Sequence, residues 1–288
     1  MYKKKLTTII FICLTSMVSY SQIKGTVINS TSNKGISYAN LSVKNKPIGT
    51  SADRNGNFIL FGLDMKDTLI VSAVGYTTKS IVSDKVKDTI YLTPETIELN
   101  PISLKVTKNE NKKNKPILRS HANRIKKSNT DTFFRNSDEV WIIGRLYEYQ
   151  SEYAQTPYIE KLEFVTRSEV EGSIFNIRLY NVDSNGFPSS YLWRENIVVS
   201  VKKGKRVTEI DISKLNIKFP EEGIVVAVEG LHIETNRYEQ EIVQFESNGN
   251  KKSKTETFYE PGFGMSYIDS NKSSFLFSMG NWIRMYNH

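Results

Sequence analysis

The chain has 288 residues, of which 39% are apolar and 24% are charged, and this composition is typical of a globular protein with about two domains. The balance excludes a disordered or fibrous chain. The net charge of +8 is modest for this length, so we do not expect nucleic acid as a partner.

The N-terminus predicts a secretory signal peptide at residues 1–21. Three lysines at residues 3–5 precede an apolar core at residues 6–14, and the small Ser19 and Ser21 suit a signal peptidase site. A membrane anchor is the weaker interpretation, because the apolar run is too short to span about 30 Å of hydrocarbon. We therefore expect an exported protein, either periplasmic or associated with the outer membrane and cell surface.

Cleavage after Ser21 would leave a mature chain that begins at Gln22 and has no cysteine. The single cysteine, Cys13, lies inside the apolar core and follows the bulky Ile12, which argues against a lipoprotein. Removing the three lysines lowers the net charge from +8 to +5. We expect a mature protein that does not span the membrane and is held together by core burial without disulfides.

Short apolar alternations closed by turns dominate residues 23–76. Asp53 and Gly56 supply turn chemistry, because Asp bonds its own backbone and Gly tolerates positive φ. The pairs expected to share the apolar face of a strand are Leu41 with Val43, Phe58 with Leu60, and Leu69 with Val71. This pattern predicts a small β-sandwich.

Four motifs in this stretch resemble the carboxypeptidase-like regulatory domain. They are Gly25–Val27, Gly35–Val43, Gly49–Phe58 and the Val-Gly-Tyr corner at residues 74–76. The resemblance implies a seven-stranded transthyretin-like sandwich at residues 22–106. Apolar residues at 97–104, interrupted by Pro101, predict its last strand. It also implies a structural and docking module without an active site.

Residues 107–130 are polar and basic, which predicts a linker. Eight lysines and arginines crowd this segment, and only Glu110 opposes them. A solvated connection is one interpretation; the other is a contact with an anionic surface.

Period-2 alternation returns after Val140, so we expect a second antiparallel sandwich at residues 131–288, jelly-roll-like if the order is Greek key. The apolar runs are Leu162 with Phe164, Phe175 with Ile177 and Leu179, Ile197 with Val199 and Val201, and Ile224 with Val226 and Val228. Residues 177–228 also resemble a recurring C-terminal module of exported proteins. That resemblance extends the architecture but not the chemistry.

Motifs for catalysis do not appear in the sequence. His232 and Glu234 have the wrong spacing for a zinc peptidase, and no Gly-x-Ser-x-Gly elbow occurs. The Asp-x-Asn-Gly stretches at Asp53 and Asp183 lack the later acid of a calcium loop, so we interpret them as β-turns. We therefore predict no catalytic residues, no metal site and no cofactor.

The alternative is an enzyme acting on envelope polysaccharide through an unlocated carboxylate pair in the C-terminal domain. Candidates such as Glu169 with Glu171, or Glu221 with Glu222, are more typical of solvated strands and turns.

Aromatic residues give the remaining functional signal. Tyr191 and Trp193 are two apart, so an extended chain would direct them to the same side. They follow Gly186 and Pro188 in a loop-like stretch, with Arg194 beside them. We predict Tyr191, Trp193 and Arg194 as a ligand site, against the alternative that Trp193 caps the core. The favoured function is a non-catalytic exported protein that docks a glycan or an envelope protein.

Overall fold

The computed structural model describes residues 22–95, 130, 132–137, 139–245, 251–265 and 273–285. Within them the fold is all-β, with short 3₁₀ turns at Ser83–Lys85, Ser151–Gln155, Ser213–Leu215 and Glu234–Asn236. The predicted signal peptide, the expected strand at residues 97–104 and the linker at residues 107–129 lie outside the described residues. No described helix is long and apolar enough to cross a membrane.

Seven strands of the first sandwich lie within the described residues. They are β1 (Gln22–Asn29), β2 (Asn40–Val43), β3 (Gly49–Ser51), β4 (Asn57–Phe61), β5 (Thr68–Ser72), β6 (Lys79–Val82) and β7 (Thr89–Leu92). One sheet has the order β4-β1-β7 and the other has the order β3-β2-β5-β6. All pairs are antiparallel except β1 with β7.

The apolar alternation places its side chains in one core, as the sequence predicted. On β4, Phe58 and Leu60 are buried while their neighbours are exposed, because successive side chains point to opposite faces. The preceding turn forms as expected: the Asp53 carbonyl accepts a hydrogen bond from Gly56 N at 3.1 Å, and the Asp53 carboxylate accepts one from Asn55 N at 2.7 Å.

Two further antiparallel sheets form the second sandwich. Its strands are β8 (Phe133–Asn136), β9 (Ile142–Tyr147), β10 (Lys161–Ser168), β11 (Ser173–Val182), β12 (Pro188–Tyr191), β13 (Ile197–Val201), β14 (Gly204–Asp211), β15 (Ile224–Gly230), β16 (Arg237–Phe245), β17 (Lys251–Gly264), β18 (Ser274–Ser278) and β19 (Asn281–Met285). The seven-stranded sheet has the order β12-β11-β15-β9-β18-β19, with β13 paired to β11. The five-stranded sheet has the order β14-β10-β17-β16, with β8 paired to β17.

The core between these two sheets contains the apolar runs that the sequence predicted. It joins Phe175 and Ile177 of β11 to Val226 of β15, and Phe164 of β10 packs against it from the facing sheet. The all-β, two-sandwich fold class is therefore confirmed.

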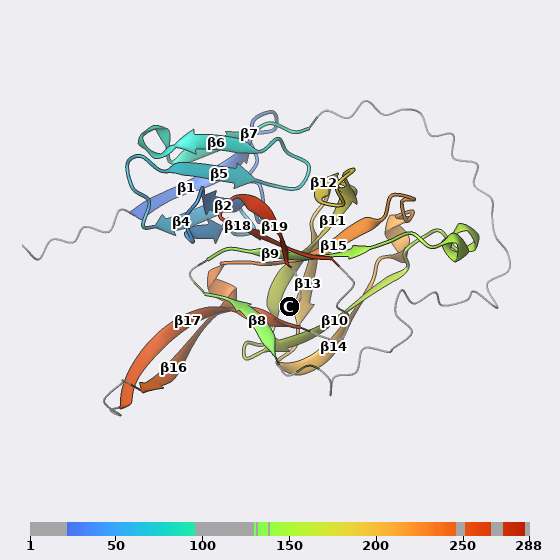
Figure 1. The fold of residues 1–288 in the computed structure, drawn as a ribbon. Coiled ribbons are helices and arrows are strands. Elements are labelled where there is room, and N and C mark those ends of the chain that lie inside the picture. Colours follow the sequence, from blue (N-terminus) through green and yellow to red (C-terminus); the bar gives the residue numbers. More distant parts are fainter. Residues whose placement is uncertain are drawn as a thin grey trace, which may run out of the picture.

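The seven-stranded sheet is buried on both of its faces along β15, where all seven residues are buried. Its inner face belongs to the sandwich core, and its outer face packs partly against the first sandwich. Strand β2 of that sandwich is also buried throughout. Figure 1 shows β2 beside β18 and β19, and the Met279 carbonyl accepts a hydrogen bond from Asn45 N at 3.2 Å.

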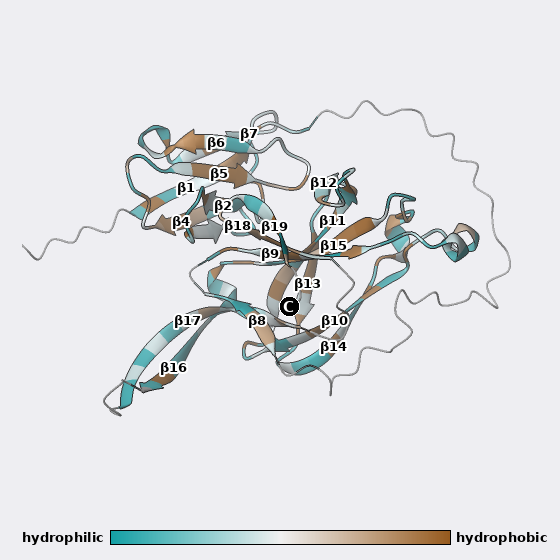
Figure 2. Ribbon diagram, viewed as in Figure 1, coloured by the Kyte–Doolittle hydropathy of each residue, from teal (hydrophilic) through white to brown (hydrophobic). Residues whose placement is uncertain are grey.

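A long hairpin extends away from both sandwiches. We call residues 237–245 of β16 and 251–258 of β17 the arm, which Figure 1 shows protruding from the body. Figure 2 shows β5 and β15 largely in brown, whereas the outer part of the arm is mostly teal and white. The arm therefore contributes little to the apolar core.

Candidate functional site at the domain interface

A buried ion pair lies on the outer face of the seven-stranded sheet. Asn176 of β11 is directly opposite Glu229 of β15, and Arg178 is two residues further along the same face of β11. Arg178 donates from Nε to Glu229 Oε2 and from Nη2 to Glu229 Oε1, both at 2.7 Å. Both side chains are 0% exposed, so the bidentate pair is fully removed from water.

Polar neighbours complete the hydrogen bonding of this pair. Arg178 Nη1 donates to the Tyr191 hydroxyl at 2.6 Å, and Asn176 Nδ2 donates to Glu229 Oε2 at 3.2 Å. Burial alone would lower the pKa of Arg178, but the Glu229 carboxylate outweighs it and holds this pKa well above its usual value. The guanidinium stays charged, so this pair is not a proton-transferring couple.

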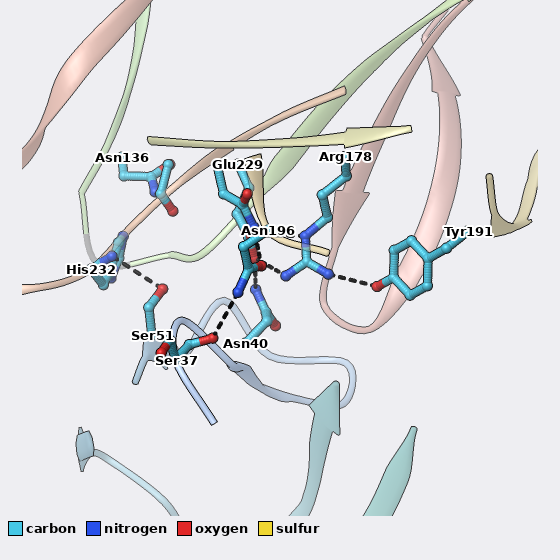
Figure 3. Close-up of polar contacts among 11 residues, drawn as sticks. Ser37, Asn40, Ser51, Asn136, Arg178, Tyr191, Asn196, Glu229 and His232 are labelled. Carbon is cyan, nitrogen blue, oxygen red and sulfur yellow. Dashed lines mark hydrogen bonds and ion pairs between the residues drawn. The ribbon is translucent and has the colours of Figure 1, made fainter. Parts of the chain in front are cut away.

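Residues of the first sandwich close over this polar face. Asn40 Nδ2 donates to Glu229 Oε1 at 3.4 Å, and Ser51 Oγ accepts from the His232 backbone N–H at 3.2 Å (Figure 3). Asn196 Nδ2 donates to the Ser37 carbonyl at 3.2 Å. The ion pair is therefore part of the contact between the two sandwiches.

His232 lies just after β15, beside the same contact. Its ring stacks on Tyr259 with centroids 4.1 Å apart. Burial lowers the pKa of His232 to about 3, and the hydrogen bond to the Glu139 backbone offsets only part of this effect. The imidazole is neutral at physiological pH, and its Nε2 has no hydrogen-bond partner among the described residues.

The three residues predicted as a ligand site are half-buried and turn to different neighbours. Tyr191, at the end of β12, stacks on Tyr180 at 4.9 Å and accepts the bond from Arg178. Trp193 packs against the core between the two sheets, whereas Tyr191 packs in a separate cluster on the outer face. Arg194 pairs with Glu95 of the first sandwich at 2.7 Å. They do not share one side, and their ligand binding stays a prediction.

The acidic residues considered for an enzyme have separate roles. Glu169 pairs with Arg167 at 3.0 Å, and Glu171 accepts from Lys203 N at 2.8 Å. Glu260, an acid outside the predicted candidates, is 1% exposed and lies 3.3 Å from Arg135, and burial raises its pKa. Among the described residues, no group of three or more His, Cys, Asp and Glu could hold a metal ion.

Sequence reasoning missed the Arg178–Glu229 pair, although a signal was present. Glu229 follows five apolar residues of β15, whereas Arg178 lies in a part of β11 where apolar and polar residues alternate and gives no such signal. A charge inside a strand that is apolar on both faces indicates a buried partner, because Arg and Glu are almost never fully buried alone. The sequence does not identify the partner, which is 51 residues away.

These features define an all-β protein of two sandwiches that meet at a buried polar contact. Residues 23–118 match the family model of the CarboxypepD_reg-like domain, which confirms the resemblance seen in the sequence. In its family this domain is non-catalytic. No curated protein matches the chain.

Proposed function

We propose that this is a non-catalytic, exported protein of the cell envelope, in the periplasm or at the cell surface, that docks an envelope protein through the arm. The signal-peptide pattern of residues 1–21 supports export. The non-catalytic class of the N-terminal domain supports a docking role. The burial of Arg178 and Glu229 as an ion pair at the contact between the two sandwiches also supports a docking role.

The observation that carries the proposal is the outer edge of the arm. Strand β16 is the terminal strand of its sheet and pairs only with β17 among the described strands. It has nine residues and no proline, whereas edge strands are usually short or interrupted to prevent pairing with other chains. Val243 on this strand is 52% exposed.

A two-stranded hairpin in water is only marginally stable, and a third strand stabilises it. An extended segment of a partner can bond to the free N–H and C=O groups of β16 and add a strand to the sheet. The arm extends from the body (Figure 1), which leaves room for such a segment.

Site-specific photo-crosslinking in the intact envelope tests this docking. We expect a crosslinker at Val243 to yield a discrete protein adduct. The matched control is Ile283 of β19, which has the same 52% exposure but lies outside the arm. Equal adducts at both positions, or none at Val243, would contradict the proposal.

Trimming the arm gives a second test. Gln240 and Glu256 are opposite each other in the register, so an Asn-Gly turn that replaces residues 241–255 should close a shorter hairpin. We expect this variant to keep the melting temperature of the body. In co-purification it should lose the protein that crosslinks at Val243 of the full chain. Retention of that protein at full yield would exclude the arm as the docking site.

Export and the absence of catalysis are tested separately. The intact mass of the exported protein should correspond to a chain that begins at Gln22, and a mass that includes Cys13 or a lipid would overturn this start. On an array of envelope glycans we expect no turnover. Hydrolysis of any glycan would favour the enzyme alternative.

A further inference from the structure

The contact between the two sandwiches is polar at its centre. The first sandwich contributes Asn40, Ser42 and Ser51, and the second contributes Asn176, Arg178, Glu229 and His232, all of them buried. Permanent interfaces resemble a domain core cut in half and are mainly apolar, whereas interfaces between domains that move are more polar. The centre of this contact is of the second kind, although Val140 packs beside Gly49 and Ile70 packs beside Gly280 as apolar contacts between the two sandwiches.

The hydrogen bonds that Arg178 makes within the second sandwich are shorter than most of those that cross the contact. Arg178 bonds Glu229 at 2.7 Å and Tyr191 at 2.6 Å, all within one sheet. The crossing bonds to Glu229, to Ser51 and to the Ser37 carbonyl measure 3.2–3.4 Å. The ion pair therefore keeps its strongest partners without the first sandwich (Figure 3).

Several buried polar atoms at this contact have no hydrogen-bond partner among the described residues. They are Asn40 Oδ1, Ser42 Oγ, Asn176 Oδ1 and His232 Nε2. Burying such atoms unpaired opposes closure, because each gains hydrogen bonds to water when it is exposed. The short bonds of Arg178 within one sheet and the buried polar atoms without a partner thus both favour a contact that can open.

We propose that the two sandwiches form a reversible latch, in which the first sandwich separates as a folded unit from the outer face of the seven-stranded sheet and exposes the Arg178–Glu229 pair. The sheet itself stays intact, because the core between β11, β15 and the facing sheet does not involve the first sandwich. Likewise, the core of the first sandwich consists only of its own residues. Each unit keeps its apolar core when the contact opens.

Thiol labelling on the two faces of one strand tests the latch. In β2, Ser42 faces the contact and is 3% exposed, whereas Val43 belongs to the core of the first sandwich and is 0% exposed. The full chain with Cys13→Ser has no other cysteine, so Ser42→Cys and Val43→Cys can each be introduced alone. Under native conditions we expect the thiol at position 42 to react at least tenfold faster than the thiol at position 43.

Equal labelling rates would overturn the proposal, because both thiols would then become accessible only by global unfolding. If Val43→Cys destabilises the protein, the thiol at position 43 reacts faster. This reduces the expected difference between the two positions and so cannot produce it. Ser51→Cys, which also lies at the contact and is 3% exposed, repeats the test if Ser42→Cys fails to fold. Circular dichroism melting checks that each variant is folded.

A loosening variant adds a directional test. Arg194 and Glu95 form an ion pair across the rim of the contact, with Arg194 Nη1 2.7 Å from Glu95 Oε2. In the Ser42→Cys background, Arg194→Ala should raise the labelling rate at position 42 several-fold. The open state and the unfolded state both lack this ion pair, so the rate at position 43 should rise by no larger a factor. An unchanged rate at position 42 would contradict the latch.

Discussion

The two faces of strands β11 and β15 differ in chemistry although they share one backbone. The inner face carries Phe175 and Ile177 in a core joined to the facing sheet. The outer face carries Arg178 and Glu229, with Asn176 directly opposite Glu229, under the first sandwich. Burial is complete on both sides, so burial alone does not distinguish a fixed core from a contact between units. The polarity of the buried side chains distinguishes them.

The largest effect should follow from breaking the outer-face ion pair on one side only. Arg178→Met leaves the Glu229 carboxylate buried and unpaired, so we expect the free energy of unfolding to fall by about 3–5 kcal/mol. The double variant Arg178→Met/Glu229→Leu should be much less destabilised, because it removes both charges. Urea unfolding of the single and double variants measures this coupling. Additive losses would show that the two charges do not act as a pair.

Trp193→Ala probes the inner face. Trp193 packs against the core between the sheets, so truncation should cost about 3 kcal/mol, the lower end of the range for Phe and Trp truncations. A melting curve and a glycan-binding assay on the same variant separate the two interpretations of Trp193, which are a core residue and a residue of a ligand site. An unchanged melting temperature with lost binding would support the predicted ligand site of Tyr191, Trp193 and Arg194.

His232 should make stability pH-dependent at the edge of the outer face. Its pKa is about 3 in the folded protein, against an ordinary value of 6.5, so the unfolded chain binds more protons between these values. Stability should therefore fall as the pH drops below 6.5, by about 2 kcal/mol between pH 7 and pH 5. The variant His232→Phe keeps a ring to stack on Tyr259 and should lose this pH-dependent part. An identical pH profile in the variant would assign the dependence to other groups.

Arg194→Ala should have the smallest effect. Arg194 and Glu95 are 32% and 35% exposed, and such an ion pair contributes roughly 0.2–1 kcal/mol. We expect a small fall in the free energy of unfolding that shrinks further in high salt. A loss as large as that of Arg178→Met would mean that the rim, and not the centre, holds the two sandwiches together.

Local sequence patterns predicted the strands and turns of both sandwiches well. The pairs Phe58 with Leu60 and Leu69 with Val71 lie in the core of the first sandwich, and the expected apolar residues of β10, β11, β13 and β15 lie in or against that of the second. These predictions succeeded because strand periodicity and turn chemistry depend on residues that are close in sequence. The β-turn at Asp183 forms for the same reason, with its carbonyl accepting from Gly186 N at 2.9 Å.

Only the tertiary structure decided what covers each strand and which distant polar groups meet. The sequence predicted one buried face for β15, but docking of the first sandwich and packing of neighbouring strands bury both faces. Arg178 and Glu229 meet because the β11–β15 register aligns residues 51 positions apart. Asn40 reaches Glu229 across 189 positions and between two sandwiches. Such contacts depend on strand order and docking, which periodicity within a strand does not encode.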